Sequence, residues 1–181
     1  MRLETERLIL REFTAGDWPV LLAQHQDPRY RAQYPNGYDS EPNLRRLLDM
    51  FLAWQQEGPR YRWQLAITLR GSDALIGNCG IRLQAPGAGV AEMGYGLAVE
   101  HWRQGYASEA ARRMLRFAFE ELGVHRVGAR VVETNARSLA VLRRLGFVPE
   151  GRLREHEHIG DVWHDDLMFG LLRQEWERAS L

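Results

Sequence analysis

The chain has 181 residues, of which 45% are hydrophobic and 27% are charged. These proportions are typical of a folded globular domain and exclude a disordered chain. The length predicts one domain over residues 1–181. Basic and acidic residues number 24 each, so the charge balance indicates neither a nucleic-acid partner nor a membrane surface. Arg112, Arg113 and Arg116 cluster on a predicted helix, where we expect them on the exposed face.

A single cysteine, Cys79, excludes an intrachain disulfide and favours a reducing compartment. It stands in the apolar run LIGNCGI, so we expect a buried core residue rather than a nucleophile. The opening MRLETERLIL lacks the apolar region and cleavage site of a signal peptide. No apolar run approaches the ~18 residues of a membrane span. We therefore expect a cytoplasmic protein.

The predicted elements follow from hydrophobic periodicity and from the turn residues between periodic stretches. In chain order they are a strand at 7–13, a helix at 17–26, a loop at 27–40, a helix at 40–58, strands at 63–69, 74–83 and 91–99, a helix at 107–122, a strand at 127–132, a helix at 138–145, and strands at 147–154 and 162–171. This order predicts a mixed α/β domain in which helices flank a central mixed β-sheet.

The most informative stretch is GYGLAVEHWRQGYASEA, at 94–110. A predicted strand ends near Val99, and a tight turn that contains Gly105 leads directly into the longest helix. Free amides at a helix start bind anions with the help of the helix dipole, and Gly105 lets the backbone approach a ligand closely. We therefore expect a diphosphate on the amides from about Arg103 to Ser108. The alternative is a plain helix start, because an isolated glycine turn is a weak signal.

Two other phosphate-binding motifs are excluded, because the chain lacks the G-x-G-x-x-G spacing and the Gly-Lys-Ser/Thr of a Walker loop in this turn. Five stretches instead resemble one family in the right order: TERLILREF, LIGNCGI, EMGYGLAVEHWRQGYASEA, HRVGARVVETNARSLAVLRRLGFVPEG and WHDDLMFGLLRQEW. Over nearly its whole length the chain resembles the GCN5-related N-acetyltransferase (GNAT) superfamily, and within it the RimJ/RimL-like ribosomal-protein acetyltransferase branch. Trp102 departs from the superfamily motif but is common in this branch, and Arg103 stands where the branch usually has glycine.

The resemblance implies a fold, a co-substrate and a set of binding residues. In this family the central strands splay apart after the motif strand, so that the pantetheine arm of acetyl-CoA can pair with the strand end as an added strand would. The coenzyme-binding residues implied by the motif are Leu97, Ala98, Val99, Arg103, Gln104, Gly105, Tyr106, Ala107, Ser108 and Asn135. For Asn135, capping of the following helix is the alternative role.

Acetyl transfer to an amine needs a neutral amine, a stabilised oxyanion and a leaving thiolate. By the resemblance, Glu92 is the leading candidate for the general base, acting directly or through water. An ordinary solvated carboxylate is the alternative. Ser138 is the candidate acid toward the thiol, with a hydroxyl at a helix start as its alternative. A backbone N–H near Ala98 is the candidate oxyanion donor.

The strands near the carboxyl end are rich in histidine and acidic residues: His156, His158, Asp161, His164, Asp165 and Asp166. Their spacing is not that of a structural zinc site, and the family needs no metal, so we expect surface or acceptor-side roles and no metal ion. His156 or His158 is an alternative candidate for the base.

These observations predict an N-acetyltransferase that moves the acetyl group of acetyl-CoA to a primary amine, on a protein N-terminus or on a small molecule. The alternative function is a non-catalytic acyl-CoA-binding regulatory module on the same fold. A purely structural domain explains neither the motif turn nor the Asn135-x-x-Ser138 element. The sequence leaves the acceptor open, and with it the oligomeric state, for which a homodimer is the commonest assembly.

Overall fold

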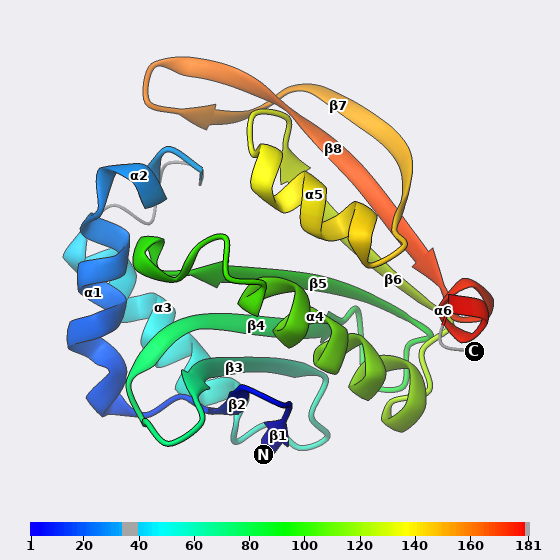
Figure 1. Cartoon of the computed structure of the whole chain (residues 1–181), viewed down its shortest axis with the longest axis horizontal. Coiled ribbons are helices and arrows are strands. Elements are labelled where there is room, and N and C mark those ends of the chain that lie inside the picture. The colour runs from blue at the N-terminus through cyan, green and yellow to red at the C-terminus, as the bar shows by residue number, and fades with distance from the viewer. Residues whose placement is uncertain (34–39, 180–181) are drawn as a thin grey trace.

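The computed structural model describes residues 1–33 and 40–179. Its eight strands form one sheet in the order β1-β2-β3-β4-β5-β6-β8-β7 (Figure 1). The strands are β1 (Arg2–Glu4), β2 (Leu8–Glu12), β3 (Arg62–Leu69), β4 (Leu75–Leu83), β5 (Val90–Leu97), β6 (Arg126–Val132), β7 (Val148–Ile159) and β8 (Val162–Leu172). The helices are α1 (Trp18–Gln26), α2 (Pro28–Arg31), α3 (Glu41–Trp54), α4 (Tyr106–Arg116), α5 (Ala136–Arg144) and α6 (Arg173–Ala179), with short turns η1 (Ala15–Asp17), η2 (Val99–His101) and η3 (Phe117–Glu121).

The sheet opens between its two central strands. β5 and β6 run parallel and pair only from Val90 opposite Arg126 to Glu92 opposite Gly128. Beyond Glu92, β5 stays paired with β4 as far as Leu97, so it separates from β6. Figure 1 shows β6, β8 and β7 diverging from the other strands. The predicted mixed sheet flanked by helices, splayed after the motif strand, is confirmed.

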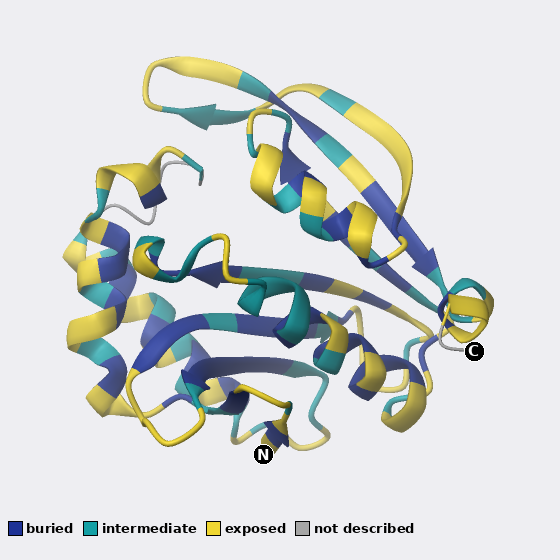
Figure 2. Cartoon of the chain, viewed as in Figure 1, coloured by how far each residue is buried: buried dark blue, intermediate teal, exposed yellow. Residues whose placement is uncertain are grey.

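Alternate side chains of the sheet face two separate helical layers. Ile81 and Met93 belong to a large core that also contains Met114 of α4. The opposite face contributes Ala66 to a smaller core with Phe51 of α3. In Figure 2 these central strands and the inner sides of the helices are buried, whereas much of the β7–β8 hairpin is exposed. The two faces of the opening are therefore bordered by different helices.

Several elements differ from the predicted ones. The β1 strand has three residues, of which only Leu3 is buried, which is too short a pattern to recognise. In the predicted loop 27–40, the Asp27 carboxylate accepts the Arg29 N–H and starts the four-residue α2, because a proline in the first turn also suits a helix. The rest of that loop, 34–39, lies outside the described residues. The predicted strand 91–99 ends two residues early, and η2 follows it.

Two expectations about single features are confirmed in full or in part. Cys79 is fully buried, and burial raises the pKa of its thiol to about 12, so it is a core residue. Arg112 and Arg116 are exposed on α4 as expected, whereas the Arg113 side chain is only 19% exposed and lies 3.4 Å from Glu121, so the expectation is wrong for Arg113. Over residues 1–33 and 40–179, no helix combines the length and the apolar character needed to cross a membrane.

Candidate functional site

A cavity of about 660 Å³ lies where β5 and β6 separate. Its lining comes from both faces of the sheet. The turn before α4 and the first turns of α5 border one side, while α1, α2 and α3 border the other. The two sides meet along β5, where Met93 and Leu97 line the cavity, and along β6, where Ala129 and Val131 do. The structure thus places a binding space at the site that the splayed strands predicted.

The turn before α4 is shaped to expose backbone amides. Gly105 is the N-cap of α4, with a φ of 84°, a left-handed conformation that glycine adopts without strain. Arg103, two residues earlier, has a φ of 62°, which explains why glycine is common at that position. The amides of Tyr106, Ala107 and Ser108 are in the first helical turn, where no intrahelical acceptor is available. This turn can therefore bind an anion at the positive end of the helix dipole.

Two residues near the start of the chain, Thr5 and Arg7, hold this turn in place through Glu109 of α4. The Arg7 side chain donates to Oε2 of Glu109 at 2.7 Å and to the Gln104 carbonyl at 3.0 Å, and its guanidinium lies 4.7 Å from the Tyr106 ring centroid. The Thr5 hydroxyl donates to Oε1 of Glu109 at 2.6 Å. Burial alone would raise the pKa of Glu109, but these hydrogen bonds outweigh it and hold the pKa below its ordinary value. The Thr5–Arg7–Glu109 group therefore fixes the turn and α4 to the first strands.

We expect Glu109→Gln to weaken coenzyme binding about tenfold, equivalent to about 1.4 kcal/mol, because Arg7 loses its charged partner and no longer holds the Gln104 carbonyl firmly. Calorimetric titration with CoA measures the effect. Glu4→Gln is the matched control, since Glu4 makes ion pairs with Arg2 and Arg70 at 2.9 Å outside the cavity lining. Equal affinities for the Glu109→Gln variant and the wild type would show that the Thr5–Arg7–Glu109 group does not hold the turn in its binding conformation.

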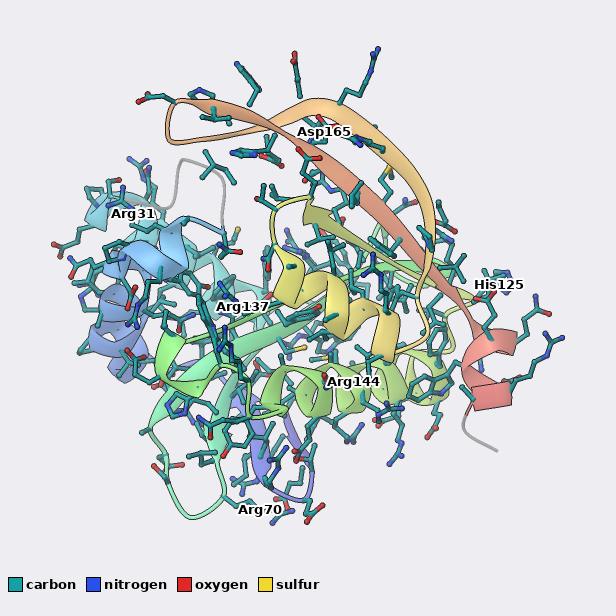
Figure 3. All side chains as sticks on the ribbon, turned by 45° about the horizontal axis from the view of Figure 1, so that its top comes forward. Arg31, Arg70, His125, Arg137, Arg144 and Asp165 are labelled. Carbon is teal, nitrogen blue, oxygen red and sulfur yellow. The ribbon has the colours of Figure 1, made fainter. Side chains whose placement is uncertain are left out.

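Arginines border the helical side of the cavity. Arg103, Arg137 and Arg144 all line it, and Figure 3 labels Arg137 and Arg144 on α5. The Arg137 guanidinium lies 3.8 Å from the Trp102 ring centroid, and the Trp102 indole donates to the Leu97 carbonyl at 2.8 Å. Trp102 is thus fixed to the end of β5, and the arginines give this side of the cavity the positive charge that phosphate groups require.

Ser138 lies opposite β5, on the first turn of α5. Its Oγ is 3.0 Å from the Tyr95 hydroxyl, so this pair bridges the opening between β5 and α5. The Asn135 side chain accepts the Ser138 N–H at 3.1 Å and caps α5. Asn135 therefore has the capping role that the sequence left as its alternative, and it also lines the cavity. All three residues line the same space as the turn before α4.

Acidic groups gather on the other side of the cavity. Glu92, Glu157 and Asp166 line it together with Arg130, which lies 3.8 Å from both the Glu92 and the Asp166 carboxylates. The Glu92 side chain is 49% exposed, whereas that of Glu157 is 22% exposed. Burial and the neighbouring charge of Asp166 raise the pKa of Glu157 above its ordinary value. A carboxylate with a raised pKa is better suited to accept a proton near neutral pH.

The carboxyl-terminal histidines lie beside this acidic group. His156 Nδ1 is 3.1 Å from the Asp166 carboxylate, and His158 packs against Trp163 at a ring-centroid distance of 4.9 Å. One possible ligand atom from each of His156, Glu157 and Asp166 lies within 4.8 Å of the others. The Arg130 guanidinium already supplies positive charge to this cluster. The Asp166 carboxylate thus has two partners, His156 at 3.1 Å and Arg130 at 3.8 Å.

Asp161, His164 and Asp165 belong to the β7–β8 hairpin outside the cavity lining. The Asp165 carboxylate accepts the Glu155 N–H at 2.8 Å and pairs with Arg152. These contacts hold the pKa of Asp165 below its ordinary value. Asp165, labelled in Figure 3, therefore stabilises the bend in the hairpin.

Not every predicted coenzyme residue reaches the cavity. Leu97, Arg103, Gly105, Tyr106, Ala107, Ser108 and Asn135 line it, whereas Ala98, Val99 and Gln104 do not. The Ala98 N–H donates to the Ile76 carbonyl at 2.9 Å, so this amide is occupied within the sheet, and the oxyanion donor predicted near Ala98 stays a prediction for a neighbouring amide. Because N–H directions alternate along a strand, the Leu97 amide faces the opening instead, beyond the last β5–β6 pair at Glu92 and Gly128.

Two residues of the site were missed by sequence reasoning. Tyr95 alternates with apolar neighbours along β5, so it was assigned only to the strand pattern. Its position three residues after Glu92 was the available signal that its ring projects to the other face. Glu157 lies in a strand that continues to Ile159, five residues beyond the predicted end, and its role depends on β8 contacts that no local pattern contains.

Comparison with known proteins identifies the family and the fold of the chain. A model of the acetyltransferase (GNAT) domain matches residues 7–148. The uncharacterised N-acetyltransferase p20 of Bacillus licheniformis is 34% identical over 96% of this chain and 97% of its own length. A GNAT-family acetyltransferase of Bacillus anthracis has a TM-score of 0.81 at 24% identity, covering 96% and 99% of the two chains. The ribosomal L7/L12 α-N-protein acetyltransferase RimL, solved with coenzyme A, has a TM-score of 0.80 at 20% identity, covering 95% and 98%.

The two solved structures show a shared fold. The family model and the p20 relative show that the chain is homologous to GNAT acetyltransferases. GNAT enzymes use acetyl-CoA, and the turn before α4 and the arginines of α5 fit its phosphate groups. The chain is an acetyltransferase that belongs to the GNAT family.

Proposed function

We propose that the protein transfers the acetyl group of acetyl-CoA to a primary amine, on a protein N-terminus or on a small molecule. The observation that carries the proposal is the cavity at the β5–β6 opening, which has arginines and free amides on one side and carboxylates on the other. The first side suits an anionic coenzyme, and the second attracts an ammonium ion. RimL, which shares the fold, carries a protein acceptor in its name, and this supports a protein N-terminus as one acceptor class.

Each side of the cavity has a role in this proposal. Bound acetyl-CoA supplies the thioester. The amides of Arg103 to Ser108 hold its diphosphate, and the Leu97 amide orients its pantetheine arm along β5. Glu92 or Glu157 takes the proton of the incoming ammonium group. The Ser138 hydroxyl, held by Tyr95 at 3.0 Å, donates a proton to the departing thiolate.

Ser138→Ala is expected to lower turnover about tenfold or less while leaving coenzyme affinity nearly unchanged. A thiol with a pKa of about 8.5 already leaves readily, so this acid contributes less than the ~10²–10⁴-fold of general acid catalysis. Tyr95→Phe should have a similar effect, because Ser138 loses its hydroxyl partner. Asn135→Ala should weaken coenzyme binding, because the first turn of α5 loses its cap. Steady-state kinetics in which Ser138→Ala lost affinity at unchanged turnover would contradict the acid role.

The function is tested by thiol release from acetyl-CoA in the presence of an amine panel, with mass spectrometry of the products. The proposal predicts equal amounts of released thiol and acetylated amine. A non-catalytic acyl-CoA-binding module is the competing function, and it predicts coenzyme binding by calorimetry without thiol release from any amine.

A further inference from the structure

The acceptor side of the cavity has a cation that the acetyl transfer described above does not use. Arg82 of β4 lines the cavity and is half-buried. Its Cα is paired with that of Glu92 across β4 and β5. The two side chains therefore stand next to each other on the same face of the sheet.

That face is the one turned away from α4. Met93 lies in the α4 core, so its neighbours Glu92 and Gly94 project to the opposite face. A Cβ added to Gly94 would lie 3.5 Å from Nη2 of Arg82. The guanidinium therefore lies over β5, the strand along which the coenzyme arm is proposed to bind.

Arg82 also has no counterion among residues 1–33 and 40–179. Its cross-strand neighbour Glu92 lies 3.8 Å from Arg130 instead, and no carboxylate of the described residues lies within 4.0 Å of the Arg82 guanidinium. The amides of Gln64 and Asn78 line the same side and bond to each other at 2.9 Å. A half-buried guanidinium without an anion is a ready site for one, because its desolvation is otherwise uncompensated.

We propose, on the basis of the function above, that the acceptor is an amine with a carboxylate a few bonds away, and that Arg82 binds this carboxylate. Glu92 and Arg82 then form a complementary pair for a zwitterion, one facing the ammonium group and the other the carboxylate. The absence of side chains at Gly94 and Gly96, which line the cavity, leaves room for the acceptor against β5. A free amino acid or an N-terminal peptide with an acidic second residue has this chemistry.

The test uses acceptor pairs that differ only in the charge of one group. Free L-amino acids are compared with their amides, peptides with Asp at the second position with those that have Asn, and spermidine serves as an acceptor without an anion. An amide has the lower amine pKa and so more neutral amine, which means that intrinsic reactivity favours the amide. We expect the best carboxylate acceptor to exceed its uncharged partner at least about tenfold in kcat/KM, the size of a charge-assisted hydrogen bond.

Arg82→Gln should abolish this preference through a higher acceptor KM, with the acetyl-CoA KM unchanged, and Arg82→Lys should restore part of it. Arg116→Gln, an exposed position on α4, is the control. The amino-acid and peptide pairs distinguish the two sources of the carboxylate. Equal or better transfer to amides or spermidine, or a preference that persists in Arg82→Gln, would overturn this inference alone. Failure of the wild type to bind acetyl-CoA would instead contradict the proposed function.

Discussion

Gly105→Val is expected to lower the affinity for CoA by at least about a hundredfold, equivalent to about 2.7 kcal/mol. The φ of 84° at this position is a conformation that a β-branched residue rarely adopts. A Cβ there would also lie 3.3 Å from Nη2 of Arg7, the guanidinium that holds Glu109 and the Gln104 carbonyl. The substitution therefore turns the amides away from the diphosphate and also displaces the Arg7 guanidinium that holds the turn in place.

Gly71→Val separates this effect from general strain. Gly71 has a φ of 81°, and an added Cβ would meet no atom within 4 Å. Gly71→Val therefore has the same backbone penalty as Gly105→Val, about 1–3 kcal/mol, without any contact with the site. Both variants should lose similar thermal stability, and only Gly105→Val should lose calorimetric affinity for CoA. Unchanged affinity in Gly105→Val would contradict the assignment of the diphosphate to this turn.

Glu157→Gln is expected to lower kcat/KM by about 10²–10³-fold, within the range of general base catalysis. Burial and the charge of Asp166 raise the pKa of Glu157. The base is active when deprotonated, so in the wild type kcat/KM should rise with pH through this raised pKa. The variant should lose that acid limb, because a glutamine does not titrate.

Glu92→Gln provides the comparison within the same site. Its side chain is 49% exposed and close to Arg130, so we expect a smaller loss of about tenfold, greatest at low pH, where neutral amine is scarcest. The two pH–rate profiles distinguish the carboxylates. A larger loss in Glu92→Gln, with the acid limb abolished there and retained in Glu157→Gln, would make Glu92 the base. Wild-type profiles in both would direct attention to His156.

The strand–turn–helix from Glu92 to Ser108 could be predicted because its signal is local. Glycine at a left-handed position and a periodic helix after a strand are visible in a short stretch of residues. The same is true of the Asn135 cap, which the sequence offered as one of two roles. The order of helices and strands along the chain followed from hydrophobic periodicity and turn residues, and the splaying of the central strands followed from the family resemblance.

The rest of the site depends on contacts between distant residues. Arg7 and Glu109 are 102 positions apart, and Tyr95 meets Ser138 over 43 positions. Neither periodicity nor composition contains such contacts. The sequence could not say which amide near Ala98 faces the opening for a related reason, since the direction of each N–H depends on the register with β4, which only the paired strands define.

A crystal structure of the protein with bound CoA tests the central claim most directly. We predict the diphosphate within hydrogen-bonding distance of amides between Arg103 and Ser108, the pantetheine arm along β5 paired with the Leu97 backbone, and the sulfur near the Ser138 hydroxyl. Density for CoA on another surface, with the opening between β5 and β6 occupied by side chains, would contradict the account.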